Sequence, residues 1–237
     1  MTNLQYDQIF AQRGAQYHAA MRRFPRVRAA EFARAFERRP VRQGQRVLDI
    51  PAGGGYVAPL LAGAEVTHLE LTAGFGGAVP VVAVDGPWPV GRFDHVLCGA
   101  ALHHIDDQAG FVARLLEHLE PDGTLHLFDV AVGSPIAAFL DGFVGRHNGT
   151  GHAGRYLPAD IASVRGGGRV EFCGELACPW LFASRADLRA FCHGLFGLAE
   201  VDPAELEAAL AELVGIRERD GVVSLDWRLT YVDLRLD

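Results

Sequence analysis

The chain has 237 residues, of which 49% are hydrophobic and 22% are charged, and its formal net charge is −7. This length and composition are typical of a single globular domain with room for a substantial core. The sequence contains no apolar run of the roughly 18 to 20 residues that cross a bilayer, and no signal-peptide core. We therefore expect a cytoplasmic protein without a membrane partner.

The basic residues and the cysteines exclude several kinds of site. All 22 basic residues are arginine, and the absence of lysine excludes Schiff-base catalysis and a P-loop lysine. The four cysteines form no C-x-x-C pair, so we expect neither a zinc knuckle nor a disulfide scaffold.

The N-terminal segment predicts two helices, over residues 4–18 and 26–38, with a break near Pro25. Residues 1–46 contain ten arginines and only three acidic residues, which could indicate an RNA-binding arm. Apolar residues alternate with the arginines at helical spacing, however, and the whole chain is acidic. We therefore expect an amphipathic helix with a solvated arginine face and no nucleic-acid partner.

A short apolar strand then ends at Asp49 and leads into Gly53, Gly54 and Gly55. Glycines allow a ligand to approach the backbone, and free N–H groups at a helix start can bind a carboxylate or a phosphate. A second strand ends at Glu70, and a carboxylate at about that offset binds ribose in doubly wound sheets. Together these features predict a site for a nucleoside cofactor.

The glycine spacing leaves two cofactor classes open. Gly53-x-Gly55-x-x-Ala58 fits a relaxed dinucleotide fingerprint, which would make the protein a nicotinamide oxidoreductase. Asp49 argues against that alternative, because a carboxylate repels a pyrophosphate. S-adenosylmethionine (SAM) instead offers an ammonium group to Asp49 and a carboxylate to the N–H groups of the loop.

Three further strands are expected over residues 79–84, 95–98 and 124–129. The first leads to Asp85, the second runs into a Leu-His-His turn, and the third follows a helix and a Pro-x-Gly turn. Their continuous apolar character is typical of parallel strands that are buried on both faces.

In this order and spacing, the motifs from about residue 45 to 132 resemble the class I SAM-dependent methyltransferases, in their small-molecule branch (methyltransferase type 11/12-like). Pro51 departs from the pattern, because it stands where the family usually has its first glycine. The connection 72–78 also departs from it, because it is too short and glycine-rich for a helix. The resemblance implies an α/β, doubly wound, Rossmann-like sheet of seven strands, mostly parallel with the last strand antiparallel.

The same resemblance implies SAM as cofactor and S-adenosylhomocysteine (SAH) as product. The residues that it places around the cofactor are Tyr17, Asp49, Ala52, Gly53, Gly55, Glu70, Leu71, Asp85, Gly86 and Gly99. We expect a single domain over residues 1–237, with an N-terminal helical cap (1–44), a SAM-binding core (45–132) and a C-terminal part (133–237). That last part is expected to hold a lid loop, a helical insertion and the final antiparallel strands, with helices over 134–144, 184–194 and 203–214 and strands over 170–176 and 225–234.

Candidate catalytic residues are the histidines His103, His104, His147 and His152. His103 and His104 follow a strand at the mouth of the sheet, and as neighbours on one turn they are not expected to face the same pocket. His147 and His152 lie in a glycine-rich loop, whose Arg146, Arg155 and Tyr156 are candidates for binding the substrate. No metal site is expected, because no carboxylate or thiol clusters near His147 and His152 in the sequence.

These observations predict a methyltransferase that transfers a methyl group from SAM to an oxygen or nitrogen of a small-molecule acceptor, possibly in specialised metabolism. The alternative is a SAM-binding protein without methyl-transfer activity, which would keep the same motifs. The acceptor and the oligomeric state are not encoded in any motif of the sequence.

Overall fold

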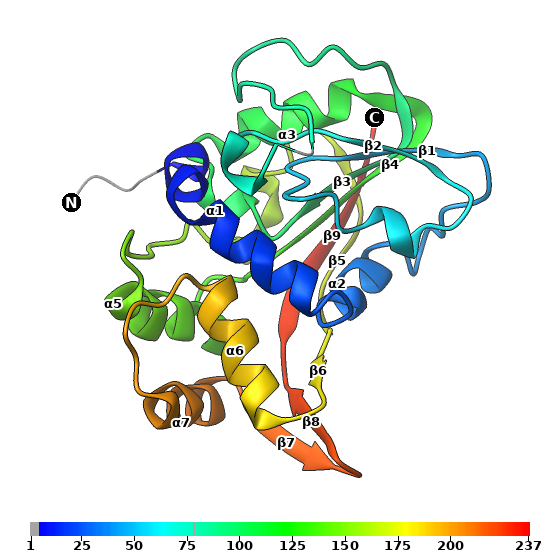
Figure 1. The fold of residues 1–237 in the computed structure, drawn as a ribbon. Coiled ribbons are helices and arrows are strands. Elements are labelled where there is room, and N and C mark those ends of the chain that lie inside the picture. The colour runs from blue at the N-terminus through cyan, green and yellow to red at the C-terminus, as the bar shows by residue number, and fades with distance from the viewer. Residues whose placement is uncertain (1–4, 78) are drawn as a thin grey trace.

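The computed structural model describes residues 5–77 and 79–237, and its centre is a twisted six-stranded sheet (Figure 1). The strand order is β2-β1-β3-β4-β9-β5, and only β9 runs antiparallel to its neighbours. The strands are β1 (Arg46–Asp49), β2 (Glu65–His68), β3 (Phe93–Gly99), β4 (Leu119–Asp129), β5 (Arg169–Ala177) and β9 (Arg228–Arg235). This confirms the predicted α/β, mostly parallel sheet with an antiparallel last strand.

The predicted count of seven strands is wrong, because residues 79–84 do not form a strand. They contribute only an isolated parallel bridge between Val81 and Glu70. Pro80 has no N–H to donate to a ladder. Within residues 72–77, the connection that precedes it contains only the short 3-10 turn η2 (Ala73–Phe75), which agrees with the prediction that this connection is too short for a helix; residue 78 lies outside the described residues.

Side chains of alternate residues along each strand pack into two separate cores, one on each face of the sheet. Leu48 and Val96 belong to the core beneath α3 (Gln108–Glu117), whereas Val47 and Leu97 belong to the core beneath α2 (Ala29–Ala35). Both faces of the central strands are therefore covered, as the continuous apolar strands predicted.

The N-terminal helix α1 (Tyr6–Arg23) runs between η2 and α6 (Arg185–Leu195), beside the carboxyl ends of the strands (Figure 1). Its contact with η2 is made by backbone, because an added Cβ at Gly74 would lie 1.9 Å from the carbonyl oxygen of Phe10. Between β1 and β2 the chain forms one 3-10 turn, η1 (Ala58–Leu60).

After β4 the chain forms one continuous helical run, longer than the predicted 134–144. It consists of α4 (Pro135–Ala138), the π-helical turn η4 (Phe139–Val144) and α5 (Gly145–His147). The side chain of Ser134 caps its start by accepting a hydrogen bond from the N–H of Ala137 at 3.1 Å. Beyond it, the glycine-rich loop contains the short turn η5 (Ile161–Ser163).

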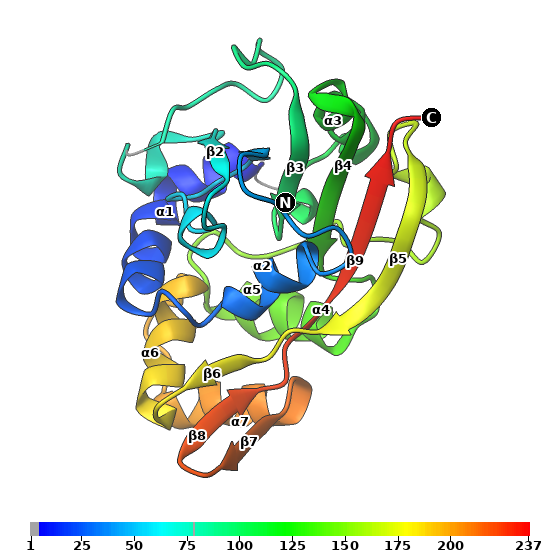
Figure 2. The same ribbon diagram turned by 90° about the vertical axis from the view of Figure 1, so that its right-hand side faces the viewer.

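A second, three-stranded sheet was not predicted (Figure 2). It has the order β6-β8-β7, from β6 (Trp180–Phe182), β7 (Ile216–Arg219) and β8 (Val222–Leu225). The helical insertion expected before the last strand is present as α6 and α7 (Pro203–Leu213), capped by Ser184 and Asp202. The predicted strand 225–234 is divided, because Leu225 ends β8 and β9 begins at Arg228.

No helix within the described residues has both the length and the apolar character needed to cross a membrane.

Candidate active site

Asp49 ends β1 and lines a narrow cavity at the carboxyl ends of the central strands, together with Ala52, Gly53 and Gly99. Its Oδ2 lies 3.0 Å from Nδ1 of His68, the last residue of the neighbouring strand β2. Burial raises the pKa of the Asp49 carboxyl, and the hydrogen bond from His68 opposes this shift. The His68 partner could not be predicted from the sequence, because the pairing depends on the register of β1 and β2.

The glycine loop turns sharply over this cavity. Gly53 and Gly55 have φ angles of +58° and +77°, a region that other residues rarely adopt. A Cβ at Gly54 would lie 2.3 Å from Nδ1 of His18, and that nitrogen lies 2.8 Å from the hydroxyl of Tyr56. His18 of α1 and Tyr56 therefore cover the loop on its outer side.

Glu70 is buried beneath the glycine loop. Its Oε2 accepts hydrogen bonds from the N–H of Gly53 at 2.5 Å and from the hydroxyl of Tyr6 at 3.2 Å, and its Oε1 accepts one from the N–H of Leu71 at 2.7 Å. Burial raises the pKa of Glu70 to about 7, although these donors favour the charged form. In this structure Glu70 braces the loop, and its role toward a ribose stays a prediction.

A wider groove of about 880 Å³, which shares Tyr6 with this cavity, runs along residues 81–85 and the start of α3. Leu71 and Asp85 line it, and Phe111 and Arg114 form part of its other wall. Two other predicted cofactor residues lie elsewhere. Gly55, at the end of the glycine loop, faces the ring of His68. Gly86 donates its N–H to the carbonyl of Ala83 at 3.2 Å. Neither of these two glycines lines the groove.

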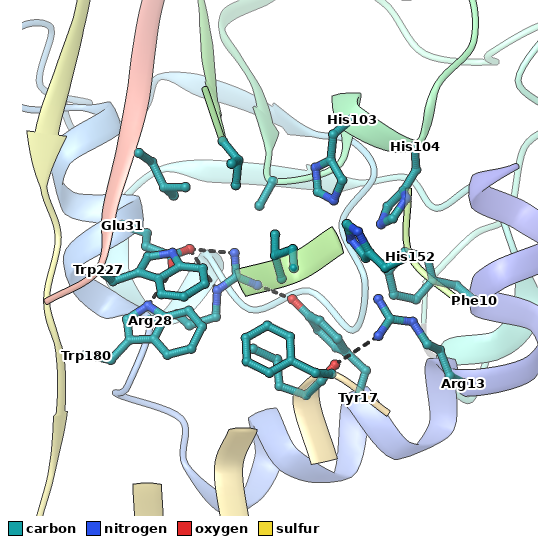
Figure 3. A pocket seen from close by; sticks show the side chains of 16 residues that line it. Phe10, Arg13, Tyr17, Arg28, Glu31, His103, His104, His152, Trp180 and Trp227 are labelled. Carbon is teal, nitrogen blue, oxygen red and sulfur yellow. Dashed lines mark hydrogen bonds and ion pairs between the residues drawn. The ribbon is translucent and has the colours of Figure 1, made fainter. Parts of the chain in front are cut away.

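A second cavity, which we call the acceptor cavity, lies beside the first and shares Phe10 and Tyr17 of α1 with it (Figure 3). Aromatic side chains form much of its wall, and the rings of Trp180 and Trp227 stack there with centroids 4.2 Å apart. Both tryptophans belong to the apolar core on this face of the sheet. They are buried, but they also line the cavity, together with Phe10, Tyr17 and Phe196.

One end of the acceptor cavity is closed by a buried ion pair between Arg28 and Glu31. The guanidinium Nε donates to Glu31 Oε2 at 2.7 Å, and Trp180 Nε1 donates to Glu31 Oε1 at 2.5 Å. Arg28 also donates to the hydroxyl of Tyr17. The amphipathic-helix interpretation missed this pair, because it assigned every arginine of the segment to a solvated face.

The opposite end of the cavity holds His103, His104 and His152 (Figure 3). The rings of His103 and His104 lie 4.0 Å apart between centroids, and both residues are buried. The expectation that only one of them faces the pocket is wrong. The short turn η3 (Leu102–His104) is buried between β4 and α1, so one ring points toward Asp129 and the other toward Phe10, with the cavity between them.

Two of these histidines are oriented by carboxylates. His103 Nδ1 lies 2.6 Å from Asp129 Oδ1, and the backbone N–H of His103 donates to Asp129 Oδ2 at 3.0 Å. His152 Nδ1 lies 3.0 Å from Asp141 Oδ1, which also accepts a hydrogen bond from Tyr156 at 2.5 Å. The loop that carries His152 is held in place because the N–H of Arg155 donates to the carbonyl of His103 at 2.9 Å.

Other residues predicted for this region lie outside the acceptor cavity. His147 Nε2 is 3.3 Å from Glu205 of α7, and Arg146 is exposed to solvent. Arg155 is also exposed, with its guanidinium 2.9 Å from Asp106. Tyr156 stands behind the histidines, with its ring 5.9 Å from that of His103.

Arg13 of α1 does line the acceptor cavity, next to the histidines. Its Nη1 donates a long hydrogen bond of 3.4 Å to the carbonyl of Leu195, and its buried Nε has no partner among the described residues. Burial lowers the pKa of this guanidinium to about 10. Arg13 and Tyr17 lie four residues apart on one face of α1, and both residues face this cavity.

Comparisons with known proteins agree with this architecture. The model of a methyltransferase domain family matches residues 17–141, just over half of the chain. A search of curated proteins finds no match. A proposed methyltransferase from Bacillus halodurans has a similar structure, with 20% identity, a TM-score of 0.59 and coverage of 86% of this chain and 98% of the other.

Two solved structures with a similar fold contain SAH. Coclaurine N-methyltransferase, bound to N-methylheliamine and SAH, is 14% identical with a TM-score of 0.58, over 88% of this chain and 70% of the other. Phosphoethanolamine N-methyltransferase 2 of Haemonchus contortus, bound to phosphomonomethylethanolamine and SAH, is 13% identical with a TM-score of 0.59, over 99% of this chain and 61% of the other.

The domain match therefore agrees with the order of motifs in the sequence and with the sheet that brings Asp49, the glycine loop and Glu70 together. The chain belongs to the methyltransferase domain family, as its resemblance to the class I SAM-dependent methyltransferases predicted.

Proposed function

We propose that this protein transfers a methyl group from SAM to an oxygen or nitrogen of a small molecule bound in the acceptor cavity. One observation carries the proposal: the narrow cavity beneath the glycine loop and the acceptor cavity share four lining residues, Phe10, Tyr17, Arg28 and Ala100. A donor in one cavity and an acceptor in the other would meet at these residues. Holding two reactants close and aligned can by itself lower the barrier to such a displacement by several kcal/mol.

The residues around the first cavity suit the groups of SAM. The Asp49 carboxylate can accept hydrogen bonds from the ammonium group, and the glycine loop can approach the methionine part closely. Leu71 and Asp85 line the wider groove, where an adenosine would lie between Val81 and Phe111. The bound cofactor supplies an electrophilic methyl group on a sulfonium.

Entry of the cofactor requires α1 to move. The cavity beneath the glycine loop has a volume of about 30 Å³, enough for one water-sized group. Phe10 and Tyr17 of α1 close it from above, so an outward movement of this helix would open both cavities together. We accordingly propose residues 1–44 as a cap over the cofactor, 45–132 as the cofactor-binding core and 133–237 as the part that carries the lid loop, all within one domain.

The acceptor cavity favours a flat, largely apolar acceptor. Its tryptophans and phenylalanines offer ring faces, and the buried Arg28–Glu31 pair offers fixed polar groups at one end. His103 is the proposed general base, because Asp129 holds its Nδ1 and leaves Nε2 to take the proton of a hydroxyl or an ammonium. Phenols and amines of specialised metabolism are acceptors of this kind.

Calorimetric titration with SAH tests the cofactor assignment first. We expect binding in the micromolar range or tighter to the folded protein, freed of co-purified ligand. No detectable binding would overturn the proposal and restore the dinucleotide alternative. If SAH binds, a panel of phenols and amines with isotopically labelled SAM tests transfer, and SAH binding without labelled product from any acceptor would favour a SAM-binding protein that does not methylate.

A further inference from the structure

We propose that His103, His104 and His152 bind a divalent transition-metal ion at one end of the acceptor cavity. One potential ligand nitrogen from each ring lies within 4.8 Å of the others. These three residues come from two separate segments, the turn η3 and the loop after α5. A sequence search around His152 could not find the site for that reason, since the nearest potential ligands in space are about fifty residues away in the chain.

The hydrogen bonds of the His103 and His152 rings leave Nε2 of each ring available to bind a metal. Nδ1 of His103 and Nδ1 of His152 each face a carboxylate, Asp129 at 2.6 Å and Asp141 at 3.0 Å. A carboxylate accepts a hydrogen bond, so the proton resides on Nδ1 and the lone pair is on Nε2. Histidine ligands in metal sites have this arrangement, in which a carboxylate fixes the tautomer and the ring orientation.

The ring of His104, the third potential ligand, has no hydrogen bond among the described residues that fixes its orientation. No described side chain or backbone group forms a hydrogen bond with the ring of His104, although the residue is buried. It contacts the rings of His103 and His152, at centroid distances of 4.0 and 5.3 Å, and is held otherwise by aromatic neighbours such as Phe10. A modest rotation would bring its nitrogen toward the other two, to the separation of roughly 3.3 Å set by metal–nitrogen bonds of about 2.0 Å in a tetrahedral site.

The surrounding charges permit a cation. Asp129 and Asp141 place two negative charges behind the histidines, and Arg13 places one positive charge on the cavity side. Arg28 and Glu31, at the far end, neutralise each other. A divalent ion would therefore meet a net negative shell, even with the opposing field of Arg13.

The ligand set indicates the class of metal. Three neutral imidazoles suit Zn²⁺, Co²⁺ or Ni²⁺ and not the hard ions Mg²⁺ and Ca²⁺. Three protein ligands also leave a fourth position open, as in catalytic zinc sites. Here that position faces the acceptor cavity, so an acceptor hydroxyl could bind the ion and lose its proton more easily. This role rests on the proposed methyl transfer, and in the loaded protein it would replace the base function of His103.

The test uses the full chain without a histidine tag, stripped of metals with a chelator. We expect Co²⁺ to bind at one ion per chain and to give the visible absorption bands of a four- or five-coordinate site, and Zn²⁺ to displace it. His152→Ala and His104→Ala should each weaken binding at least tenfold. Asp141→Asn, which removes the charge behind His152 and keeps an oxygen for Tyr156 and Gly154, should weaken it 10- to 100-fold. His147→Ala is the matched control and should bind as the unchanged protein does.

Two results would overturn the site: no stoichiometric Co²⁺ or Zn²⁺ binding to folded protein, or binding that the His104 and His152 variants leave unchanged. The buried His104 could be needed for folding, so the more peripheral Asp141→Asn decides the question if His104→Ala does not fold. SAH titration of the same samples separates this proposal from methyl transfer. SAH binding without metal binding would reject the metal site alone, and metal binding without SAH binding would reject the proposed methyl transfer alone.

Discussion

Glu70 holds the glycine loop in place, and it is also the residue predicted to bind the ribose. It is one of the most deeply buried acids of the chain, and its two carboxylate oxygens accept hydrogen bonds from Gly53, Leu71 and Tyr6. The position at the end of β2 was expected to serve ribose hydroxyls, and those hydroxyls would have to replace Tyr6 or share its acceptor. Cofactor binding and the bracing of the glycine loop are therefore coupled through one side chain.

Replacing Glu70 with alanine should weaken SAH binding by about 1–3 kcal/mol, the usual cost of losing a charged hydrogen-bond partner. Calorimetric titration measures this change. Glu65→Ala is the matched control, because Glu65 lies exposed at the start of β2, five residues before Glu70, and should leave the affinity unchanged. Equal affinities of Glu70→Ala and the unchanged protein would show that the ribose does not bind here.

Asp129 should control the rate of methyl transfer without controlling cofactor binding. In chelator-treated protein, Asp129→Asn removes the charge that holds His103 in its tautomer, so kcat should fall by roughly 10²- to 10⁴-fold, the range for a positioned general base. SAH affinity should stay the same, and KM should change little. Asp122→Asn, at the ion pair of this exposed residue with Arg235, serves as the control. A fall in KM or SAH affinity with kcat unchanged would contradict the role of Asp129 as the group that positions His103.

The helices, strands and loops that could be predicted from the sequence are those that depend on residues close together in the chain. The capped helices α6 and α7, the strand ending at Asp49 and the glycine loop depend on residues a few positions apart. The small sheet β6-β8-β7 was missed because it pairs Trp180 with Leu225 across more than forty residues. The acceptor cavity was missed for the same reason, because its walls run from Phe10 in α1 to Leu229 in β9.

The docking of α1 on η2 gives a further prediction. Gly74→Ala would place a methyl group 1.9 Å from the carbonyl oxygen of Phe10, and backbone cannot move aside as a side chain can. We expect α1 to be displaced, at a cost of roughly 1–3 kcal/mol in the free energy of unfolding. Chemical denaturation and the rate of proteolysis within residues 6–23 measure the effect.

Gly91→Ala is the control for this substitution, because a Cβ at Gly91 meets nothing within 4 Å. If Gly74→Ala is as stable as Gly91→Ala and α1 is no more open to protease, the close backbone contact of α1 with η2 does not hold in solution.

For the molecule as a whole, the uneven charge of the sequence is partly compensated by pairing between distant segments. The arginine-rich N-terminal segment and the acidic remainder meet where Arg38 Nε donates to Asp233 Oδ2 at 2.6 Å and where Arg46 lies 2.5 Å from Glu120. From Asp233 a buried chain of hydrogen bonds continues through His126 and His95, at 2.9 and 3.0 Å. This chain ties the N-terminal cap to the middle and last strands of the sheet.

The buried His95 makes the stability of the fold depend on pH. Its ring lies 3.0 Å from His126 and 3.2 Å from Gln45, and burial, followed by the neighbouring His126, lowers its pKa from 6.5 to about 4. Between these two values the unfolded chain binds a proton at this residue and the folded chain does not. Stability from this group is therefore complete above about pH 6.5 and declines as the pH falls toward 4, by about 1.4 kcal/mol per pH unit.

Other groups titrate in the same range, so the prediction concerns a difference between two proteins. The raised pKa of Glu70, about 7, gives the opposite slope, because the folded state then holds the extra proton between its ordinary value of 4.5 and that value. This contribution cancels when the unfolding free energy of His95→Gln is subtracted from that of the unchanged protein at each pH.

Above pH 6.5 that difference should be constant. Between pH 6.5 and 4 it should shrink as the pH falls, whereas His118→Gln, outside the buried chain, should give no such trend. Curves for His95→Gln and the unchanged protein that stay parallel down to pH 4 would show that His95 is protonated in the folded protein, and that the buried hydrogen-bond chain accommodates its charge.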